Sequence, residues 1–245
     1  MTHRLTWLLL LTACTFGSGC LAEVDDESTE QSELRKEGDE EEEGTGGAGG
    51  AGGATSEEEE EEEPPPEQQG VGGTPLVLSF DGTEPRYQSG GHAAFDLTGD
   101  GVCHASDWPT ARTPWLALDR DGDGRITSGL ELFGSAVTLQ SGARAQHGFQ
   151  VLAELDDNGD GRIDAQDAAF SKLVLWADDG DRLSTPGELT SLASRGVVAI
   201  ELSFWRDARC DARGNCGIER AAFTFEDGAG VKRTGTVIDV HLPYR

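Results

Sequence analysis

The chain has 245 residues, five cysteines and a net charge of −27, with 46 acidic residues against 19 basic ones. So much negative charge argues against nucleic acid as a partner, because phosphates would repel it. The length allows one medium domain, because the first seventy or so residues cannot build a hydrophobic core.

The N-terminus has the pattern of an export signal. Met1–Arg4 carries positive charge, and Leu5–Ala13 is a nine-residue apolar run, too short to span a bilayer. We predict a signal peptide over residues 1–19 and therefore an exported protein.

Two cysteines follow, Cys14 in LTAC and Cys20 in GSGC, and both phrases resemble the lipobox of bacterial lipoproteins. Cys14 has the better preceding leucine, but its use would leave an export signal of only thirteen residues. We therefore expect lipidation of Cys20, with ordinary cleavage and no lipid as the alternative. A lipid would anchor the protein at the bacterial cell envelope, at the outer membrane, without spanning the membrane.

Residues 20–74 are expected to form a disordered linker rich in acidic residues and glycine. Between Glu23 and Gln69, twenty acidic residues stand against Arg35 and Lys36. Like-charge repulsion and the lack of apolar residues keep such a segment unfolded. We interpret it as a stalk that lifts the domain off the membrane; a tail that sequesters ions or binds a partner is the alternative.

Residues 75–245 form the expected folded domain, with 26 acidic and 16 basic residues. Many of the acids are concentrated in four loops, where they repel one another unless cations separate them. Pro75–Phe80 is predicted to be the opening strand because it is a short apolar run followed by the turn Asp81-Gly82.

The first acidic loop reads DLTGDGVCHASD. An EF-hand calcium loop places oxygen ligands at positions 1, 3, 5, 7, 9 and 12, position 7 through its backbone carbonyl, and a glycine at position 6. Thr98, at position 3, and His104, at position 9, are poorer ligands for a hard ion, so we expect lower affinity here. The expected ligands are Asp96, Thr98, Asp100, Val102 and Asp107.

The second acidic loop, DRDGDGRITSGLE, follows the extended run Trp115–Leu118. The carboxylate expected at position 12 comes one residue late, as Glu131. Ser128 and Glu131 have the spacing of a capping box, so an insertion after Ile126 leaves Glu131 directed at the ion. The alternative is that Glu131 only caps the next helix. The expected ligands are Asp119, Asp121, Asp123, Arg125 and Glu131.

The third acidic loop, DDNGDGRIDAQD, has oxygen at every required position. The alternative is a surface turn rich in aspartate and glycine. Its expected ligands are Asp156, Asn158, Asp160, Arg162, Asp164 and Asp167, with Arg162, like Arg125 and Val102, contributing its backbone carbonyl. Ile163 at position 8 is expected to pair with Ile126.

Short helices are predicted around these loops, mainly from apolar residues at helical spacing. They are a helix after Ser128 with Leu130, Leu132 and Phe133, a helix from about Ala145 to Leu155, a helix with Ala168, Phe170 and Leu173, and a helix through Leu189 and Leu192 that ends at Gly196.

The fourth acidic loop, in LWADDGDRLSTPGEL, is one residue short, and Arg182 replaces the turn glycine. Thr185 and Glu188 have capping-box spacing, with proline at the first helical position. We therefore expect Glu188 to cap a helix, and Asp178 and its neighbours to hold calcium weakly or not at all.

The C-terminal part is predicted to be β-structure, with strands at Val197–Trp205, Ala221–Phe225 and Gly235–Leu242. Cys210 and Cys216 flank a turn and would most simply form a small disulfide loop in an exported protein. The alternative, in which Cys103 pairs with one of them, stays open.

Taken in order, several phrases resemble the EF-hand-like calcium module of RTX-type adhesins, haemolysin-related and other bacterial surface proteins. They are PLVLSFDG, FDLTGDGV, LALDRDGDGRITSGLELFG, GFQVLAELDDNGDGRID, LVLWADDGD with STPGEL, and RGVVAIELS. The resemblance implies extracellular calcium binding by a small α+β domain and the ligands Asp119, Asp121, Asp123, Glu131, Asp156, Asn158, Asp160 and Asp167. Ser79 replaces the usual aspartate, and RTX nonapeptide repeats are absent from the sequence, so no β-roll is expected.

The expected fold class is therefore α+β, with EF-hand-like calcium loops and short helices packed on an antiparallel sheet. The expected function is that of a non-enzymatic surface lipoprotein whose Ca²⁺ ions stabilise a module for adhesion or partner binding, with a polysaccharide or an envelope protein as partner. HExxH, GxSxG and a nucleophile with an evident base are absent from the sequence. A calcium sensor or buffer, and a hydrolase with an unrecognised site, are the alternatives.

Overall fold

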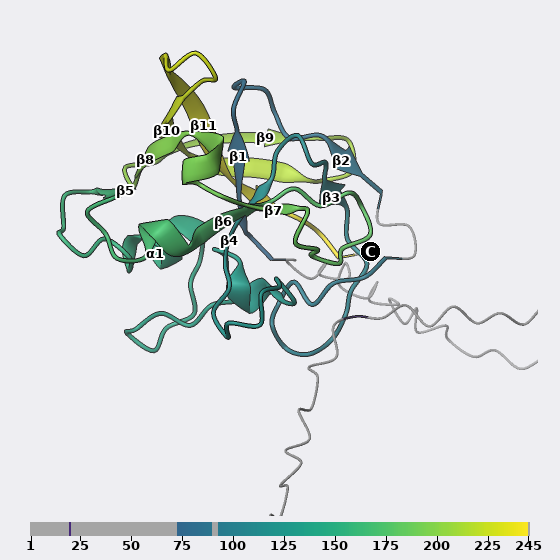
Figure 1. Cartoon of the computed structure of the whole chain (residues 1–245). Helices are drawn as coiled ribbons and strands as arrows, with labels where there is room; N and C mark the ends of the chain where they lie inside the picture. Colours follow the sequence, from purple (N-terminus) through teal and green to yellow (C-terminus); the bar gives the residue numbers. More distant parts are fainter. Residues whose placement is uncertain (1–19, 21–72, 90–92, 245) are drawn as a thin grey trace, which may run out of the picture. The chain divides into compact units, whose positions relative to one another are not determined.

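The computed structural model describes residue 20 and residues 73–89 and 93–244 (Figure 1). The predicted signal peptide and most of the predicted linker lie outside these residues.

Nine antiparallel strands form one sheet, in the order β5-β8-β10-β11-β1-β4-β6-β7, with β9 paired to β10 (Figure 1). The long strand β10 pairs with β9 along its first half and with β8 along its second half. The bounds are β1 Leu76–Ser79, β4 Trp115–Leu118, β5 Arg162–Asp164, β6 Leu173–Trp176, β7 Leu189–Ser191, β8 Val197–Glu201, β9 Trp205–Cys210, β10 Cys216–Glu226 and β11 Lys232–His241. Two short strands, β2 (Tyr87–Gln88) and β3 (Trp108–Pro109), form a second sheet.

The central strand β1 is apolar without alternation because both of its faces are buried. Leu76 and Leu78 lie in one hydrophobic core, and Val77 lies in the other. The first core also contains Phe149, Ile163 and Phe223, whereas the second gathers three tryptophans. Strands buried on both faces are expected to read as continuous apolar runs.

The predicted α+β class is wrong, because the domain is mostly β. Among the described residues, the α-helix α1 covers Gly148–Ala153, the middle of the helix expected from Ala145 to Leu155. The other expected helices are 3-10 turns: η1 (Gly129–Glu131), η2 (Phe170–Lys172) and η3 (Ala193–Arg195). No helix among the described residues is long and apolar enough to cross a membrane.

The expected helices are replaced for a common reason: the chain returns to the sheet soon after each acidic loop. Leu173 and Leu175 alternate into the core along β6, and Leu189 begins β7 where a helix was expected. Hydrophobic residues three apart fit a helix, but here they serve successive short strands. The expected stop at Gly196 is present, with φ +71°, after η3.

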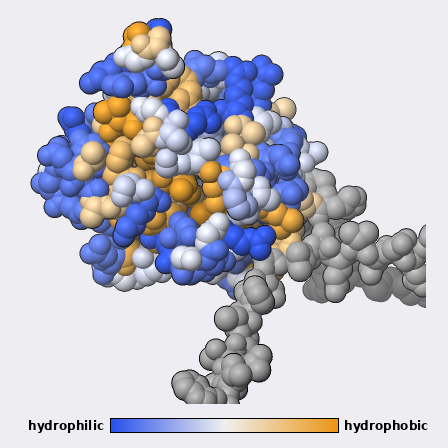
Figure 2. Space-filling view, in the orientation of Figure 1, coloured by the Kyte–Doolittle hydropathy of each residue, from blue (hydrophilic) through white to orange (hydrophobic). Residues whose placement is uncertain are grey.

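The predicted strands in other regions are confirmed. Pro75–Phe80 contains β1, and Trp115–Leu118 is β4. At the C-terminus, the strand predicted at Val197–Trp205 contains β8 and reaches the first residue of β9, Ala221–Phe225 lies within β10, and Gly235–Leu242 overlaps β11. Hydrophilic residues cover much of the face drawn in Figure 2, with hydrophobic residues gathered near its middle.

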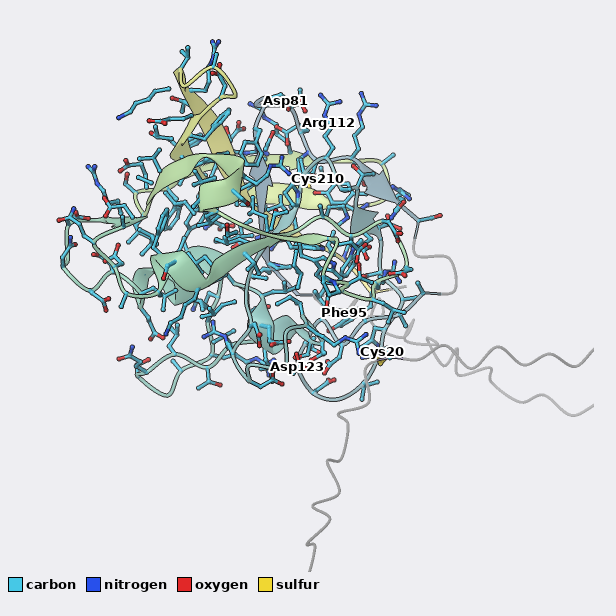
Figure 3. All side chains as sticks on the ribbon, in the orientation of Figure 1. Cys20, Asp81, Phe95, Arg112, Asp123 and Cys210 are labelled. Atoms are coloured by element: carbon cyan, nitrogen blue, oxygen red, sulfur yellow. A yellow bond between two sulfur atoms is a disulfide. The ribbon has the colours of Figure 1, made fainter. Side chains whose placement is uncertain are left out.

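Two disulfides are present in the described part of the chain. Cys210 and Cys216 join the paired strands β9 and β10, as predicted. Cys103 is joined to Cys20, a pairing that the sequence did not suggest (Figure 3 labels Cys20 and Cys210). A sulfur atom in a disulfide cannot also carry a thioether-linked lipid, so the expected lipidation of Cys20 is incompatible with this structure.

Candidate metal centres

Three of the four acidic loops have a common backbone arrangement. They follow β4, α1 and β6, and they span Asp119 to Glu131, Asp156 to Asp167 and Asp178 to Glu188. In each, the first aspartate accepts hydrogen bonds from backbone N–H groups of its own loop. The last carboxylate closes the loop, so the acids are held in place by the backbone.

In the Asp119 loop, Asp119 accepts hydrogen bonds from the N–H groups of Gly122 (2.7 Å) and Gly124 (2.9 Å). Asp123 accepts one from Arg125 N–H (2.7 Å). Carboxylate oxygens of Asp119, Asp121 and Asp123 lie within 4.8 Å of one another, close enough to share one ion. Asp123 is labelled in Figure 3.

In the Asp156 loop, Asp156 binds the N–H groups of Gly159 (2.8 Å) and Gly161 (2.9 Å) in the same way. Asp160 accepts from Arg162 N–H (3.1 Å), and Asn158 accepts from Asp160 N–H (3.0 Å). Asp164 instead caps Gln166 N–H (2.8 Å). Asn158 occupies position 3 of its loop, where the Asp119 loop has the carboxylate of Asp121.

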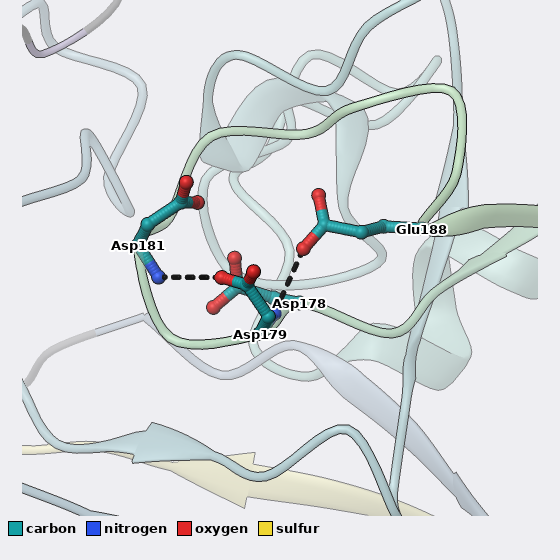
Figure 4. Close-up of side chains that lie close together, drawn as sticks. All are labelled: Asp178, Asp179, Asp181 and Glu188. Carbon is teal, nitrogen blue, oxygen red and sulfur yellow. Dashed lines mark hydrogen bonds between the residues drawn. The ribbon is translucent and has the colours of Figure 1, made fainter.

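The Asp178 loop has the most complete cluster (Figure 4). Asp178 accepts from Gly180 N–H (3.0 Å) and Arg182 N–H (2.9 Å). Carboxylate oxygens of Asp178, Asp179, Asp181 and Glu188 all lie within 4.8 Å of one another. The prediction that this loop has decayed rested on its length and on Arg182, and neither feature disperses the acids.

The closing carboxylates are equivalent in the three loops. Glu131 accepts hydrogen bonds from the N–H groups of Arg120 (3.3 Å) and Thr127 (2.7 Å). Asp167 accepts them from the N–H groups of Asp157 (2.9 Å) and Asp164 (2.9 Å). Glu188 accepts them from the N–H groups of Asp179 (2.8 Å) and Thr185 (2.9 Å). Each closing carboxylate therefore binds two backbone N–H groups of its loop. One belongs to the residue directly after the first aspartate, and the other belongs to a residue three or four positions before the carboxylate itself. Glu131 does not belong to the three-carboxylate group of its loop.

Arg182 occupies the turn position that glycine fills elsewhere. Gly124 and Gly161 have φ of +80° and +84°, and Arg182 has φ +62°, the only positive φ of a non-glycine residue in the described ranges. The side chain of Arg182 is buried, its Nη2 donates to the carbonyl of Ser106 (2.6 Å), and its guanidinium lies 5.1 Å from the ring centroid of Trp108. These contacts offset the strain of the left-handed conformation.

The Asp96 loop is different because it closes early. Asp96 holds Asp100 N–H (3.1 Å) and Gly101 N–H (2.9 Å), but Phe95 and His104 then pair as a β-bridge. The structure does not bring Asp107 to this loop.

Asp107 is fully buried and accepts hydrogen bonds from Asn215 (2.6 Å), with the guanidinium of Arg213 at 3.2 Å. Among the described residues, Asp96, Asp100 and Asp107 do not form a cluster of three acids. Thr98 and Val102, the other two residues predicted as ligands, lie on the loop, and Val102 is exposed, with its N–H donating to Asp100.

Burial acts against ionisation at the first carboxylate of the Asp178 loop and at the closing carboxylate of the Asp119 loop. It raises the pKa of Asp178 to about 6, with the neighbouring charges of Glu188 and Asp181 adding to the effect. It also raises the pKa of Glu131, against the hydrogen bonds from Thr127 and Arg120. Carboxylates that are desolvated and crowded in this way are the ones that a divalent cation would stabilise in the ionised form.

The donor set fits Ca²⁺. The clusters in the Asp119 and Asp178 loops offer carboxylate oxygens, which suit a hard cation. Among the described residues, the acids of the Asp156 loop do not form such a cluster, and Asn158 adds an amide oxygen to that loop. Acidic clusters of this kind can hold a metal ion. The sequence predicts that Asp178 and its neighbours hold calcium weakly or not at all; the structure brings four acids of this loop together, and the strength of calcium binding there stays a prediction.

The expected pairing of Ile126 with Ile163 is wrong. Ile163 pairs with Ile200 across β5 and β8 and belongs to the first core. Ile126 belongs to the second core, and its backbone is bound by Ser184 of the Asp178 loop.

Comparison with known proteins gives two findings. The family model of the SPM domain matches residues 76–242, more than half of the chain. The "Iron-regulated protein FrpA" of Neisseria meningitidis serogroup C is 36% identical over 162 residues, which are 64% of this chain and 14% of FrpA. FrpA is a protein of the RTX family, which confirms the predicted resemblance at that level. This similarity and the two disulfides indicate an extracytoplasmic protein.

Proposed function

The chain belongs to the SPM domain family, and we propose that residues 75–245 are a non-enzymatic calcium-binding module that works outside the cytoplasm. One observation carries the proposal. In three separate loops, the first aspartate and the closing carboxylate accept hydrogen bonds from backbone N–H groups at equivalent loop positions. Such repetition is expected where each loop presents oxygen atoms to an ion.

Calcium is proposed to stabilise the fold. Bound ions would neutralise the acids and hold together loops that begin at the ends of β4, α1 and β6. An ion that binds only the native state adds about 2.7 kcal/mol at a hundredfold excess over its dissociation constant. Extracellular sites bind at about 10⁻⁴ to 10⁻³ M, so the loops would be half filled or more where calcium is about 1 mM.

A sensor role has less support from this fold. Sensor EF-hands respond to calcium by opening a pair of helices. In the described residues, the single α-helix has six residues, and it precedes one loop, whereas the other two loops follow the strands β4 and β6. This arrangement favours an ion that stabilises the module over one that switches it.

Membrane attachment is the second part of the proposal. Because Cys20 is paired with Cys103, the acyl group is assigned to Cys14, which follows Leu11-Thr12-Ala13 and lies outside the described residues. A single anchor would hold the module at the envelope without a membrane span.

A partner at the envelope is the third part. Phe204 and Trp205 are 41% and 48% exposed, and the Phe204 ring stacks on Phe149 at 5.3 Å. Exposed aromatic rings held by packing suit an envelope polysaccharide or protein partner. Retention of wild-type protein, and loss of a Phe204→Ala and Trp205→Ala double variant, on immobilised envelope polysaccharide would support the polysaccharide. Equal retention would remove this surface from the proposal.

Thermal unfolding tests the calcium role. The full chain is melted in chelator and in about 1 mM Ca²⁺. We expect a higher Tm with calcium and a smaller rise when Asp123, Asp160 and Asp181 are changed together to asparagine, which keeps the oxygen that accepts the loop N–H groups. Identical melting curves in chelator and calcium would refute the proposal.

A further inference from the structure

The Asp119 and Asp178 loops are joined by one buried side chain. The Oγ of Ser184 accepts a hydrogen bond from the N–H of Ile126 (2.6 Å) and donates one to the carbonyl of the same residue (3.1 Å). Ile126 is 1% exposed and Ser184 is 3% exposed. One hydroxyl thus satisfies both backbone groups of a buried residue, as a neighbouring strand would.

The two residues occupy equivalent places in their loops. Ile126 precedes Thr127, whose N–H is held by the closing carboxylate Glu131 (2.7 Å). Ser184 precedes Thr185, whose N–H is held by Glu188 (2.9 Å). The loops therefore face each other in register, and the strands that lead into them, β4 and β6, are themselves paired.

The hydrogen bonds between Ser184 and Ile126 affect a predicted calcium ligand, because they involve the peptide group that joins Arg125 to Ile126. The N–H of Ile126 belongs to the same peptide unit as the carbonyl of Arg125, the expected ligand at position 7. Hydrogen bonding at the N–H of an amide polarises its carbonyl and fixes the plane of the peptide. The position of Ser184 therefore bears on how well the Arg125 carbonyl can serve an ion in the other loop.

We propose that the Asp119 and Asp178 loops bind Ca²⁺ as a coupled pair, in which each ion raises the affinity of the other loop through the Ser184–Ile126 bonds. The coupling rests on the proposed function, since both loops must bind calcium. An ion between Asp178 and Glu188 fixes the loop that carries Ser184, and Ser184 then holds the Arg125–Ile126 peptide. The coupling is reciprocal by linkage.

The Asp156 loop serves as an internal reference. Its residue at the equivalent position, Ile163, pairs with Ile200 of β8, so its backbone is not bound by either of the other loops. Silencing the Asp156 loop should leave the other two affinities unchanged.

Calorimetric Ca²⁺ titration of the full chain tests the coupling. Each loop is silenced by one substitution, Asp123→Asn, Asp160→Asn or Asp181→Asn, and the titration of the triple variant is subtracted to remove binding by the acidic segment. With Asp181→Asn, we expect the affinity of the Asp119 loop to fall about fivefold or more. Asp123→Asn should lower the affinity of the Asp178 loop by the same factor, and Asp160→Asn should change neither.

The role of Ser184 is tested in the same titration. In a Ser184→Ala background, Asp181→Asn should no longer change the affinity of the Asp119 loop, whereas Ser184→Thr, which keeps the hydroxyl, should preserve the effect. Ser194→Ala, an exposed serine in η3, is the matched control. Near-UV circular dichroism verifies that each variant is folded, and if Ser184→Ala does not fold, the reciprocal effects of Asp181→Asn and Asp123→Asn decide whether the loops are coupled.

Equal affinity of the Asp119 loop with and without Asp181→Asn would overturn the coupling and leave the proposed function standing. A wild-type titration that matches the triple variant would instead refute calcium binding by the loops.

Discussion

Among single residues, Asp239 is unusual because it is a carboxyl group buried in the sheet. It lies on β11 opposite Leu76, is 0% exposed, and accepts a hydrogen bond from the N–H of Gly148. Burial raises its pKa well above the usual value, and the nearby Glu219 adds to the effect against the hydrogen bond. The residues that face it thus favour the protonated form.

Asp239 should make stability fall as pH rises. A raised folded-state pKa means that the folded protein binds the proton more tightly than the unfolded chain. The contribution is therefore complete below the unfolded pKa of about 3.9 and is lost as pH rises through the folded value. In chelator, urea unfolding of Asp239→Asn should lack this fall, and the difference between variant and wild type cancels the titration of other groups. Parallel stability curves for the two proteins would contradict the assignment.

The assignment of the cysteines gives a second prediction at this scale. Non-reducing peptide mapping of membrane-extracted protein should find Cys20 linked to Cys103 and a diacylated Cys14. Cys14→Ser should then move the protein out of the detergent phase of a phase-separation assay, while Cys103→Ser should not. A lipid found on Cys20, or loss of detergent partition in Cys20→Ser with Cys14 intact, would show that the sequence-based preference was right.

At the scale of elements, the acidic loops were largely predictable, whereas the elements around them were predicted only in part. The spacing of Asp156, Asn158 and Asp160 foretold a loop with glycine at the turn, because few other structures need oxygens at that interval. One expected helix is present as α1, but the other three are 3-10 turns, because Leu130, Leu173 and Leu189 sit at spacings that fit a helix as well as a strand beside a loop. Burial against both faces of the sheet decided the outcome, and burial depends on distant strands.

The closing position could be predicted only in part. Glu131 does close its loop, as the capping-box spacing suggested, but Asp107 does not, because it is drawn instead to Arg213 and Asn215. That contact joins residues more than a hundred positions apart, which no local spacing can reveal. The same holds for the bond between Ser184 and Ile126.

The Asp178 loop gives the element-scale prediction. Glu188→Gln removes one charge from the four-carboxylate group and keeps one oxygen, which can accept from the N–H of Asp179 or of Thr185 but not from both. Calcium affinity of this loop should fall about tenfold, that is by about 1.4 kcal/mol. Calorimetric titration of the variant measures it, with Glu226→Gln on β10 as an exposed control. An unchanged titration would mean that Glu188 is not a ligand.

For the whole molecule, a nine-stranded antiparallel sheet supplies the frame, and the acidic loops mark where calcium would reinforce it. Each ion at a hundredfold excess should raise Tm by about 5 to 10 °C in a domain of this size. The disulfide between Cys210 and Cys216 should add independently, because it closes a short loop between β9 and β10. Its removal as a Cys210→Ser and Cys216→Ser double variant should cost about 2 kcal/mol of unfolding free energy, measured in urea with and without calcium. A loss that vanished in chelator would mean that the disulfide acts through an ion.

The most direct test of the account is the metal content of the purified full chain after equilibrium dialysis against buffer with about 1 mM Ca²⁺. The calcium content of each protein is measured by mass spectrometry. The wild type should retain more calcium than the Asp123→Asn, Asp160→Asn and Asp181→Asn triple variant, and the difference should approach one ion for each silenced loop. Equal calcium in the two proteins, with both folded, would contradict the claim that these loops are calcium sites.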